Sequence, residues 1–496
     1  MIEMTLREIA DIVGGTLHDV PDPEAKVTGS AEFDSRRIGS GDLFLALPGE
    51  RADGHDFAAK AVDQGAAAVL AARPVGVPAI VVEPRLGNTR AIALAHDTDG
   101  SGAAVLDALG KLARVSIDRL VAAGGLTVIG VTGSSGKTST KDLLAAVLAP
   151  LGPVVAPPGS FNNELGHPWT ALRADADTRF LVLELSARGP GHIKALTEIA
   201  PPSIGVVLNV GTAHLGEFGS REVIAQTKGE LVEALPASGL AVLNLDDHLV
   251  AKMAERTEAR VVTVGLAGNA DLRADDVTLD ENARARFTLH HKGESIPIQL
   301  AVSGEHQVGN ALSAAAVALD RGADLATIAQ ALSDASAVSA RRMDVRTRAD
   351  GVTVVNDSYN ANPDSVRAAL KALVTMAKAS EQPRRSWAVL GEMGELGEES
   401  VIEHDKIGRL VVRLDVDRLV VVGAGRPVRA LFQGSVQEGS WGEESIHVPD
   451  IESAIALLDD ELEPGDVVLV KASKSVGLWT VAEHLLGAET QQEAAR

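Results

Sequence analysis

The chain has 496 residues, of which 45% are hydrophobic and 23% are charged, proportions typical of globular proteins and not of disordered or collagen-like chains. A length in this range predicts about three domains. The net charge of −22 argues against a general nucleic-acid binder, which needs a basic face. Cysteine is absent, which excludes disulfides, thiolate nucleophiles and cysteine-ligated metal sites.

The first 15 residues, MIEMTLREIADIVGG, contain three acidic residues and lack the apolar stretch of a signal peptide. The apolar runs elsewhere, such as residues 65–72 and 419–422, are far shorter than the roughly 20 residues that span a bilayer. We therefore expect a cytoplasmic protein with no membrane insertion and no nucleic-acid partner.

Residues 1–100 are predicted to form a small α/β domain of short strands and helices. Residues 34–37 (DSRR) indicate a turn before an apolar strand at residues 41–47. Residues 55–67 have apolar side chains at helical spacing. Residues 96–103 (HDTDGSGA) have the composition of a linker, which places the first domain boundary near residue 100.

Residues 101–335 are predicted to form a central domain in which buried strands alternate with helices. A helix is expected over residues 137–148, and the expected strands are residues 126–131, 179–185, 203–209 and 239–244. This alternation predicts a mostly parallel sheet with helices on both faces. Ligands of such sheets bind beyond the carboxyl ends of the strands, so the polar residues that follow each strand are the candidates for function.

The strongest motif is GVTGSSGKTST at residues 130–140, which follows an expected strand and opens an expected helix. Small residues allow backbone N–H groups to surround phosphate oxygens, and the helix N-terminus adds partial positive charge. Lys137 can reach the β- and γ-phosphates, and the Thr138 hydroxyl can ligate Mg²⁺. The sequence therefore predicts a phosphate-binding loop, although Val131 replaces the first glycine of the longer consensus.

Three further residues are candidate metal ligands. Glu184 ends an expected strand, and a carboxylate suits Mg²⁺, which prefers oxygen ligands. On the residues alone, His214 is more simply a histidine that lies in a turn, and Lys228 is more simply a solvated helix lysine.

Residues 336–496 are predicted to form a third, α/β domain with strands at residues 352–356, 387–390, 418–422 and 466–471. The sequence GAG at residues 423–425 lacks the third glycine of a dinucleotide fingerprint, so we interpret it as a strand-to-helix turn. Glu392 and Glu395 are interpreted as residues of a solvated loop and not as a pair of catalytic carboxylates.

Taken together, these motifs resemble those of the Mur ligases, the ATP-dependent amide-bond-forming enzymes of peptidoglycan synthesis, and the resemblance extends across the whole chain. The family's phosphate loop has the shorter Gly-x-x-Gly-Lys-Thr form, which accounts for Val131. The segments that carry the resemblance are TGSSGKT at 132–138, LEL at 183–185, AHLGEFG at 213–219, TKGE at 227–230 and GEH at 304–306 with Asn310 and Ala311.

The resemblance implies ATP and Mg²⁺ as cofactors and gives roles to individual residues. ATP would be held by Gly133, Ser134, Ser135, Gly136, Lys137, Thr138, Ser139, Asn310, Arg342 and Asp357. Thr138 and Glu184 would hold one Mg²⁺, and His214 and a carbamylated Lys228 would serve the second. The catalytic set would therefore be Lys137, Glu184, His214 and Lys228. Arg341 also fits the motif that contains Arg342, and we choose Arg342 because it directly precedes Met343.

Within the family, three segments resemble the ligase that adds D-alanyl-D-alanine to UDP-N-acetylmuramoyl-tripeptide: GSFNNELGHP at 159–168, NDSYNANPDS at 356–365 and GEMGELG at 391–397. The resemblance implies that Ser35 and Arg36 contact the uridine nucleotide. The other expected substrate-binding residues are Asn162, Asn163, Glu164, Asn360, Asn362 and Ser365.

The resemblance implies three domains: a UDP-substrate-binding domain at residues 1–100, a central ATP-binding domain at 101–335 and a C-terminal Rossmann-like ligase domain at 336–496. We expect a monomer. The alternatives within the class are the preceding Mur ligase, which adds a diamino acid to the UDP-linked dipeptide, and a folate polyglutamate-type ligase. A nucleotide-binding switch is a further alternative, but the Asn-Lys-x-Asp base-specificity motif is absent.

Overall fold

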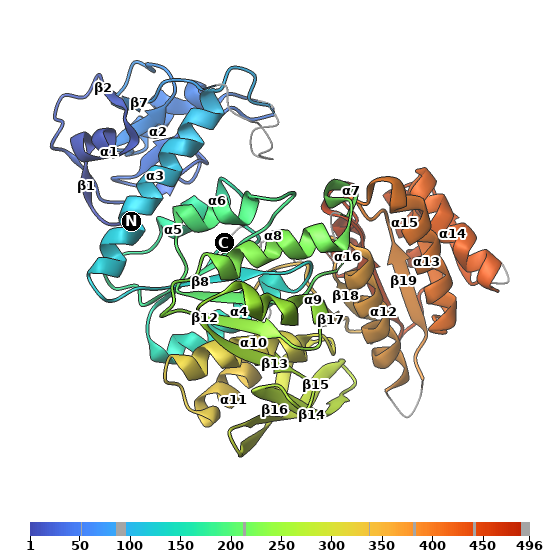
Figure 1. Ribbon diagram of the computed structural model, residues 1–496. Helices are drawn as coiled ribbons and strands as arrows, with labels where there is room; N and C mark the ends of the chain where they lie inside the picture. Colours follow the sequence, from blue (N-terminus) through green and yellow to red (C-terminus); the bar gives the residue numbers. More distant parts are fainter. Residues whose placement is uncertain are drawn as a thin grey trace.

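The structure is a computed structural model that describes residues 1–50, 52–85, 96–211, 215–336, 338–379, 383–439 and 443–487. The chain folds into three α/β parts that follow one another along the sequence (Figure 1). The expected fold class, with mostly parallel sheets in the second and third parts, is confirmed.

The first part contains a five-stranded sheet in the order β2-β7-β6-β5-β4 and a separate β1–β3 pair. The helix expected over residues 55–67 is shorter than predicted. It begins with a 3₁₀ turn, Gly54–Phe57, and ends near Gly65, whose φ of +116° breaks the helix. The elements are β1 (Met4–Thr5), α1 (Leu6–Val13), β2 (Thr16–His18), β3 (Lys26–Val27), β4 (Ala31–Glu32), β5 (Leu43–Leu45), α2 (Ala58–Asp63), β6 (Ala68–Ala71) and β7 (Ala79–Val81).

The linker expected at residues 96–103 is partly wrong, because the long helix α3 (Ser101–Ala122) begins inside it. The Asp97 carboxylate accepts hydrogen bonds from the backbone N–H groups of Gly102 and Ala103, and Asp99 accepts one from Ser101. The acidic residues of this segment therefore cap a helix, as acids at a helix N-terminus do.

The helix α3 fastens the first part to the central part (Figure 1). Its buried face, with Leu109 and Leu112, belongs to one continuous core that includes Leu6 and Ile9 of α1 and Leu181 of the central sheet. Because burial of apolar surface is the main stabilising term, the two parts are expected to behave as one unit.

The central sheet has nine strands in the order β16-β15-β14-β13-β12-β11-β8-β10-β9. Strands β8 to β14 pair in parallel, and β14, β15 and β16 form an antiparallel extension that the sequence analysis did not predict. The strands are β8 (Thr127–Thr132), β9 (Val154–Val155), β10 (Phe180–Glu184), β11 (Ile204–Val207), β12 (Leu240–Asn244), β13 (Arg260–Gly265), β14 (Leu272–Leu279), β15 (Arg284–His291) and β16 (Glu294–Ser303).

Helices cover both faces of the central sheet. One face packs against α4 (Lys137–Leu148), α10 (Gln307–Asp320) and α11 (Leu325–Asp334). The other face packs against α3 and α8 (Arg221–Glu233), within the continuous core. The remaining helices of this part are α5 (Gly166–Ala171), α6 (His192–Ile199), α7 (Leu215–Phe218) and α9 (His248–Ala251).

The third part has a six-stranded sheet in the order β17-β18-β22-β19-β20-β21, parallel except for the β17–β18 pair. The glycines of residues 423–425 form the expected strand-to-helix turn. The elements are β17 (Asp344–Thr347), β18 (Thr353–Asn356), α12 (Pro363–Lys378), β19 (Ser386–Leu390), α13 (Ser400–Arg413), β20 (Arg418–Val422), α14 (Arg426–Glu438), β21 (Ser445–Val448), α15 (Ile451–Glu461), β22 (Val467–Lys471) and α16 (Trp479–Leu485).

The third part has its own cores on the two faces of its sheet, and it meets the central part largely through polar contacts. Arg342 donates to the Ser160 hydroxyl, and Lys141 donates to the Ser339 hydroxyl. At one point backbone meets backbone, because a Cβ on Gly216 would lie 2.5 Å from the Gly397 nitrogen. A polar interface of this kind is typical of domains that move relative to each other.

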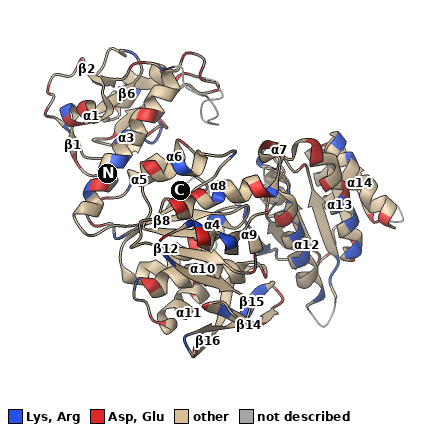
Figure 2. Ribbon diagram, in the orientation of Figure 1, with Lys and Arg blue, Asp and Glu red and all other residues tan. Residues whose placement is uncertain are grey.

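Both signs of charge are distributed over the helices of all three parts (Figure 2). Within the described ranges, no helix combines the length and apolar character needed to cross a membrane.

Helices α13 and α14 approach closely because glycines lie at their contact. A Cβ on Gly408 would lie 1.9 Å from the Leu431 carbonyl oxygen, and one on Gly434 would lie 2.3 Å from the Asp405 carbonyl oxygen. Only a residue without a side chain fits against backbone at such distances.

We predict that Gly408→Ala destabilises the third part by about 1–3 kcal/mol or more, the usual range for overpacking, because the atom it meets is backbone and cannot rotate away. Thermal unfolding monitored by circular dichroism measures the effect. Gly110→Ala in α3 is the matched control, since its Cβ would lie 3.5 Å from Ile199 in ordinary contact, and it should be neutral or stabilising by up to about 1 kcal/mol. An unchanged transition for Gly408→Ala would contradict the packing argument.

Candidate functional site

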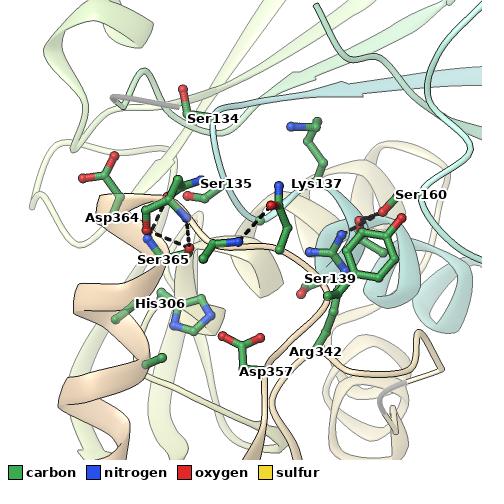
Figure 3. A pocket seen from close by; sticks show the side chains of 18 of the residues that line it. Ser134, Ser135, Lys137, Ser139, Ser160, His306, Arg342, Asp357, Asp364 and Ser365 are labelled. Carbon is green, nitrogen blue, oxygen red and sulfur yellow. Dashed lines mark hydrogen bonds between the residues drawn. The ribbon is translucent and has the colours of Figure 1, made fainter. Parts of the chain in front are cut away.

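The candidate site is a cavity of about 370 Å³ between the central and third parts of the molecule. The phosphate-binding loop after β8 and residues 186–188 after β10 line one side. Residues of the third part, including Asp357 and Lys471, line the other. Figure 3 shows Lys137, Arg342 and Asp357 around this hollow. The site therefore lies at the carboxyl ends of the strands, as predicted.

The loop between β8 and α4 adopts a conformation that depends on its glycines. Gly136 has a φ of +83°, and a Cβ there would lie 2.7 Å from the Asn310 side-chain oxygen. The Lys137 ammonium donates to the Gly133 carbonyl oxygen at 2.6 Å and thereby folds back over the loop. The loop opens directly into the α4 N-terminus, an arrangement that favours bound phosphate.

Asn209 fixes this loop from the neighbouring strand end, and the sequence analysis did not identify it. Its side-chain oxygen accepts hydrogen bonds from the backbone N–H groups of Ser134 and Ser135 at 2.9 and 3.0 Å. Its side-chain nitrogen donates to the Ser135 carbonyl oxygen. An asparagine two residues beyond the end of a buried strand was the available signal, because residues that follow the strands face the site.

Glu184 is fully buried at the end of β10. Its Oε2 accepts hydrogen bonds from the Thr138 hydroxyl at 3.2 Å and from the Asn162 amide at 3.3 Å. Its Oε1 is buried without a hydrogen-bond partner among the described residues. Burial raises the pKa of the carboxyl group, and the nearby positive charge of Arg342 partly offsets that effect. A buried carboxylate with an unused oxygen is suited to a cation ligand.

Lys228 in α8 is only 5% exposed, so the interpretation of it as a solvated lysine is wrong. Burial lowers its pKa well below the usual range, and the positive charge of Lys137 lowers it further. No carboxylate forms an ion pair with Lys228 within the ranges that the structure describes. His214, the residue predicted to act with Lys228, lies outside the described residues.

Arg342 rather than Arg341 faces the phosphate-binding loop. Arg342 donates to the Ser160 hydroxyl at 2.7 Å, and Ser160 in turn contacts the Thr138 hydroxyl at 2.8 Å. The Arg342 guanidinium also stacks over the Tyr359 ring at 4.3 Å. Arg341 points elsewhere, with an ion pair to Glu483 and a stack over Trp479.

Asp357 is held by a lysine that the sequence analysis missed. Lys471, almost fully buried, donates to the Asp357 carboxylate at 2.5 Å and to the Asn360 carbonyl oxygen at 2.9 Å. Met343 donates its backbone N–H to the other Asp357 oxygen. Lys471 is the last residue of β22, a central strand of the third part, and a lysine at the carboxyl end of a buried strand was the signal that could have identified it.

A second cavity, of about 420 Å³, adjoins the first. Asn310 of α10 lines it, and His306 and Asp364 line both cavities. Asn310 donates to the Gln307 side chain at 2.8 Å and packs on Gly136. Two joined cavities, one at the phosphate-binding loop and one beside Asn310, give room for a nucleotide.

The predicted substrate-binding residues fall into two groups. Asn162, Asn360, Asn362 and Ser365 line the first cavity. Asn362 and Ser365 form the capping box of α12, so part of their hydrogen-bonding capacity is structural. Asn163 accepts from the Gly166 N–H, and Glu164 has a buried oxygen without a partner among the described residues; neither residue lines this cavity.

Ser35 and Arg36 lie away from the cavity, in the first part of the chain. The Arg36 guanidinium is largely exposed and pairs with Asp34. Phe33, directly before this segment, packs against Phe161 and Trp169 of the central part, with ring centroids 6.4 and 5.7 Å apart. This aromatic cluster connects the segment that contains Ser35 and Arg36 to the loop that contains Asn162.

Three family models match the chain: "Mur ligase family, catalytic domain" over residues 31–101, "Mur ligase middle domain" over residues 131–318, and "Mur ligase, glutamate ligase domain" over residues 341–474. A UDP-N-acetylmuramoyl-tripeptide–D-alanyl-D-alanine ligase of Mycobacterium tuberculosis is 62% identical, with 99% of each chain covered.

Solved structures give the same result. The MurF structure from Acinetobacter baumannii matches with a TM-score of 0.81 and 29% identity, over 98% of this chain and 99% of that one. The MurF ligase from Thermotoga maritima, in complex with ADP, matches with a TM-score of 0.74 and 30% identity, over 92% and 97%.

We predict that ATP binding depends on pH through the protonation of Lys137. Burial in the site lowers its pKa to about 8, although the negative charge of Glu184 opposes this shift. Only the protonated lysine attracts phosphate, so affinity for ATP should be greatest below pH 8. Above pH 8 it should fall by roughly tenfold per pH unit until the pKa of the bound state is reached.

Calorimetric titration with ATP between pH 7.5 and 9.5 measures this dependence. Lys137→Ala should bind more weakly and lose this pH dependence, with turnover lower by about 10²-fold or more. Equal pH dependence in both proteins would contradict the assignment to Lys137.

Proposed function

The chain belongs to the Mur ligase family, and we propose that it joins D-alanyl-D-alanine to UDP-N-acetylmuramoyl-tripeptide with conversion of ATP to ADP and phosphate. The observation that carries this proposal is the cavity in which Lys137 and Thr138 of the central part face Arg342 and Asp357 of the third. Glu184 is buried behind Thr138 and accepts its hydroxyl hydrogen bond. The name of the 62% identical relative supplies the two substrates.

The reaction requires an activated carboxyl group. The carboxylate at the end of the tripeptide attacks the γ-phosphorus of ATP, forming an acyl phosphate and releasing ADP. The amine of D-alanyl-D-alanine then attacks the acyl carbon, phosphate leaves, and the amine proton passes to solvent or to the leaving phosphate. Lys137 and Arg342 stabilise negative charge on the phosphoryl oxygens.

The residues present fit Mg²⁺, which we propose as a cofactor. The unused Oε1 of Glu184 is buried close to the Thr138 hydroxyl, and Mg²⁺ usually combines one or two carboxylates with substrate phosphates. Glu184 and Thr138 would hold one ion, and His214 with a carbamylated Lys228 would serve a second. The ions would neutralise charge on the phosphates.

We propose the domain division at residues 100 and 335, since each sheet falls within one of the three ranges. The first domain would bind the UDP moiety, with Ser35 and Arg36 as contacts. The second cavity would hold adenine beside Asn310, and the first would hold the phosphates and the reacting peptide groups. The protein would act as a cytoplasmic monomer.

The preceding Mur ligase step is the alternative within the family. It requires a site for a diamino acid, with an acidic partner for the second ammonium group. The segment at residues 356–365, expected to face the incoming amine, presents amide and hydroxyl groups such as Asn360 and Asn362. Its two acids, Asp357 and Asp364, are already paired with Lys471 and Arg367, which favours a dipeptide with one amine.

We predict that D-alanyl-D-alanine, and neither lysine nor diaminopimelate, is consumed when the protein is given ATP and UDP-N-acetylmuramoyl-tripeptide. An unpaired second ammonium group in the closed site would disfavour the diamino acids by several kcal/mol. Competition between equal concentrations of the amines, followed by the mass of the UDP-linked product, is the measurement. A product formed from the UDP-linked dipeptide and a single diamino acid would move the protein one step earlier in the pathway.

Lys228 provides a test of the metal-ligand proposal. A lysine buried in this way reacts with CO₂ only when it is neutral, and its lowered pKa favours that state. Lys228→Ala should therefore lose activity by about 10²-fold or more, with partial recovery on addition of acetate or another small carboxylate. Lys252→Ala is the control, because Lys252 lies outside both cavities. A fully active Lys228→Ala enzyme would exclude the carbamate.

A further inference from the structure

Arg188 is a residue of the cavity to which the sequence analysis gave no role. It lies four residues beyond Glu184, after the end of β10, and lines the first cavity together with Ser186 and Ala187. Ser186 donates to the side-chain oxygen of Asn162 at 3.0 Å. This side of the cavity therefore consists of Asn162, Ser186 and Arg188.

The Arg188 guanidinium is held in position from two directions. One terminal nitrogen donates to Glu395 of the third part at 2.6 Å, and the other lies 3.5 Å from Glu217 in α7. Glu395 has a left-handed backbone conformation, with a φ of +62°. An arginine restrained by acids from two parts of the molecule is pre-organised to bind a ligand with a donor that neither acid uses.

One such donor is the Arg188 Nε–H. The atom is buried, and it has no hydrogen-bond acceptor within the described residues. A buried donor without an acceptor is unfavourable, and a charged N–H group is matched best by an anionic oxygen. We therefore expect a bound ligand to place an oxygen acceptor next to the Arg188 Nε–H.

The position of Arg188 indicates which substrate supplies that oxygen. The phosphates are expected at the loop that contains Lys137, whereas Arg188 follows the neighbouring strand β10. Asn162 directly follows Phe161, which packs against Phe33 of the first domain. A substrate whose nucleotide lies on the first domain would therefore pass Asn162 and Ser186 on its way to the phosphate-binding loop.

We propose that Arg188 binds a carboxylate of the UDP-linked peptide through its Nε–H, while Glu395 and Glu217 orient the guanidinium. This inference rests on the proposed function, because that function supplies a peptide carboxylate to the cavity. Arg188 is then a substrate-binding residue that positions the peptide for reaction. Since Glu395 belongs to the third domain, the orientation of Arg188 also depends on the contact between the two domains.

The test is the affinity of three variants for the UDP-linked tripeptide, measured by calorimetry without ATP and as KM during turnover. Arg188→Lys keeps the charge but removes the Nε–H, and we expect its Kd and KM for the UDP-linked tripeptide to rise about tenfold. Arg188→Ala should raise both by about 10²-fold, and Glu395→Gln should have a smaller effect of the same kind. The KM values for ATP and D-alanyl-D-alanine and the Kd for UDP alone should not change.

Arg409→Lys is the matched control, because Arg409 also pairs with two carboxylates, Asp405 and Glu438, but lies on α13 outside the cavity. A rise confined to the KM for D-alanyl-D-alanine would assign Arg188 to the other substrate. Unchanged Kd and KM values would show that Arg188 does not bind the peptide. A loss of affinity for UDP alone, together with a lower melting temperature, would show that Arg188 has only a structural role. Each of these results overturns the proposal.

If the wild-type protein formed no product from these substrates, the proposed function itself would fail. That result is separate from any effect of the Arg188 variants, because the wild-type measurement comes first. Arg188→Lys preserves charge and length, so the test remains possible if Arg188→Ala does not fold.

Discussion

The buried carboxylate of Glu184 is the group on which the rest of the site depends. A carboxylate in the protein interior is costly unless positive charge and hydrogen-bond donors surround it. Here the donors come from Thr138 and Asn162, and Arg342 supplies the largest nearby positive charge. Arg342 belongs to the third part of the chain. One buried charge therefore connects the phosphate-binding loop, the loop after β9 and the third domain.

The distribution of apolar and polar contacts explains how the three parts can cooperate. The first and central parts share a continuous core through α3, so the segment that contains Ser35 and Arg36 is rigidly related to Asn162. The third part has separate cores and meets the central part through groups such as Arg342, Lys141 and Glu395. Contacts of this type form and break at modest cost, as repeated binding and release of three substrates requires.

Much of the fold and part of the site could be predicted from the sequence, because both depend on local patterns. The strand, glycine-rich loop and helix around Lys137 have a periodicity and composition that few other structures share, and α4 has the predicted bounds. Contacts between residues that are distant in sequence could not be predicted from local patterns. Asn209 and Lys471 act on segments that are distant in sequence, and their roles follow only from the order of strands in the two sheets. The acids near residue 97 indicated a linker by composition, whereas the structure uses them to cap α3.

The backbone contact between Gly216 and Gly397 sets a lower limit on the width of the cleft. Because only hydrogen atoms separate the two backbone segments there, a methyl group at either position would push the central and third domains apart. Glu217 and Glu395, the acids that hold Arg188, lie one and two residues from these glycines, so the same displacement would loosen that contact. In the proposed reaction these two glycines would therefore help to keep water from the acyl phosphate, although neither has a side chain that could touch it.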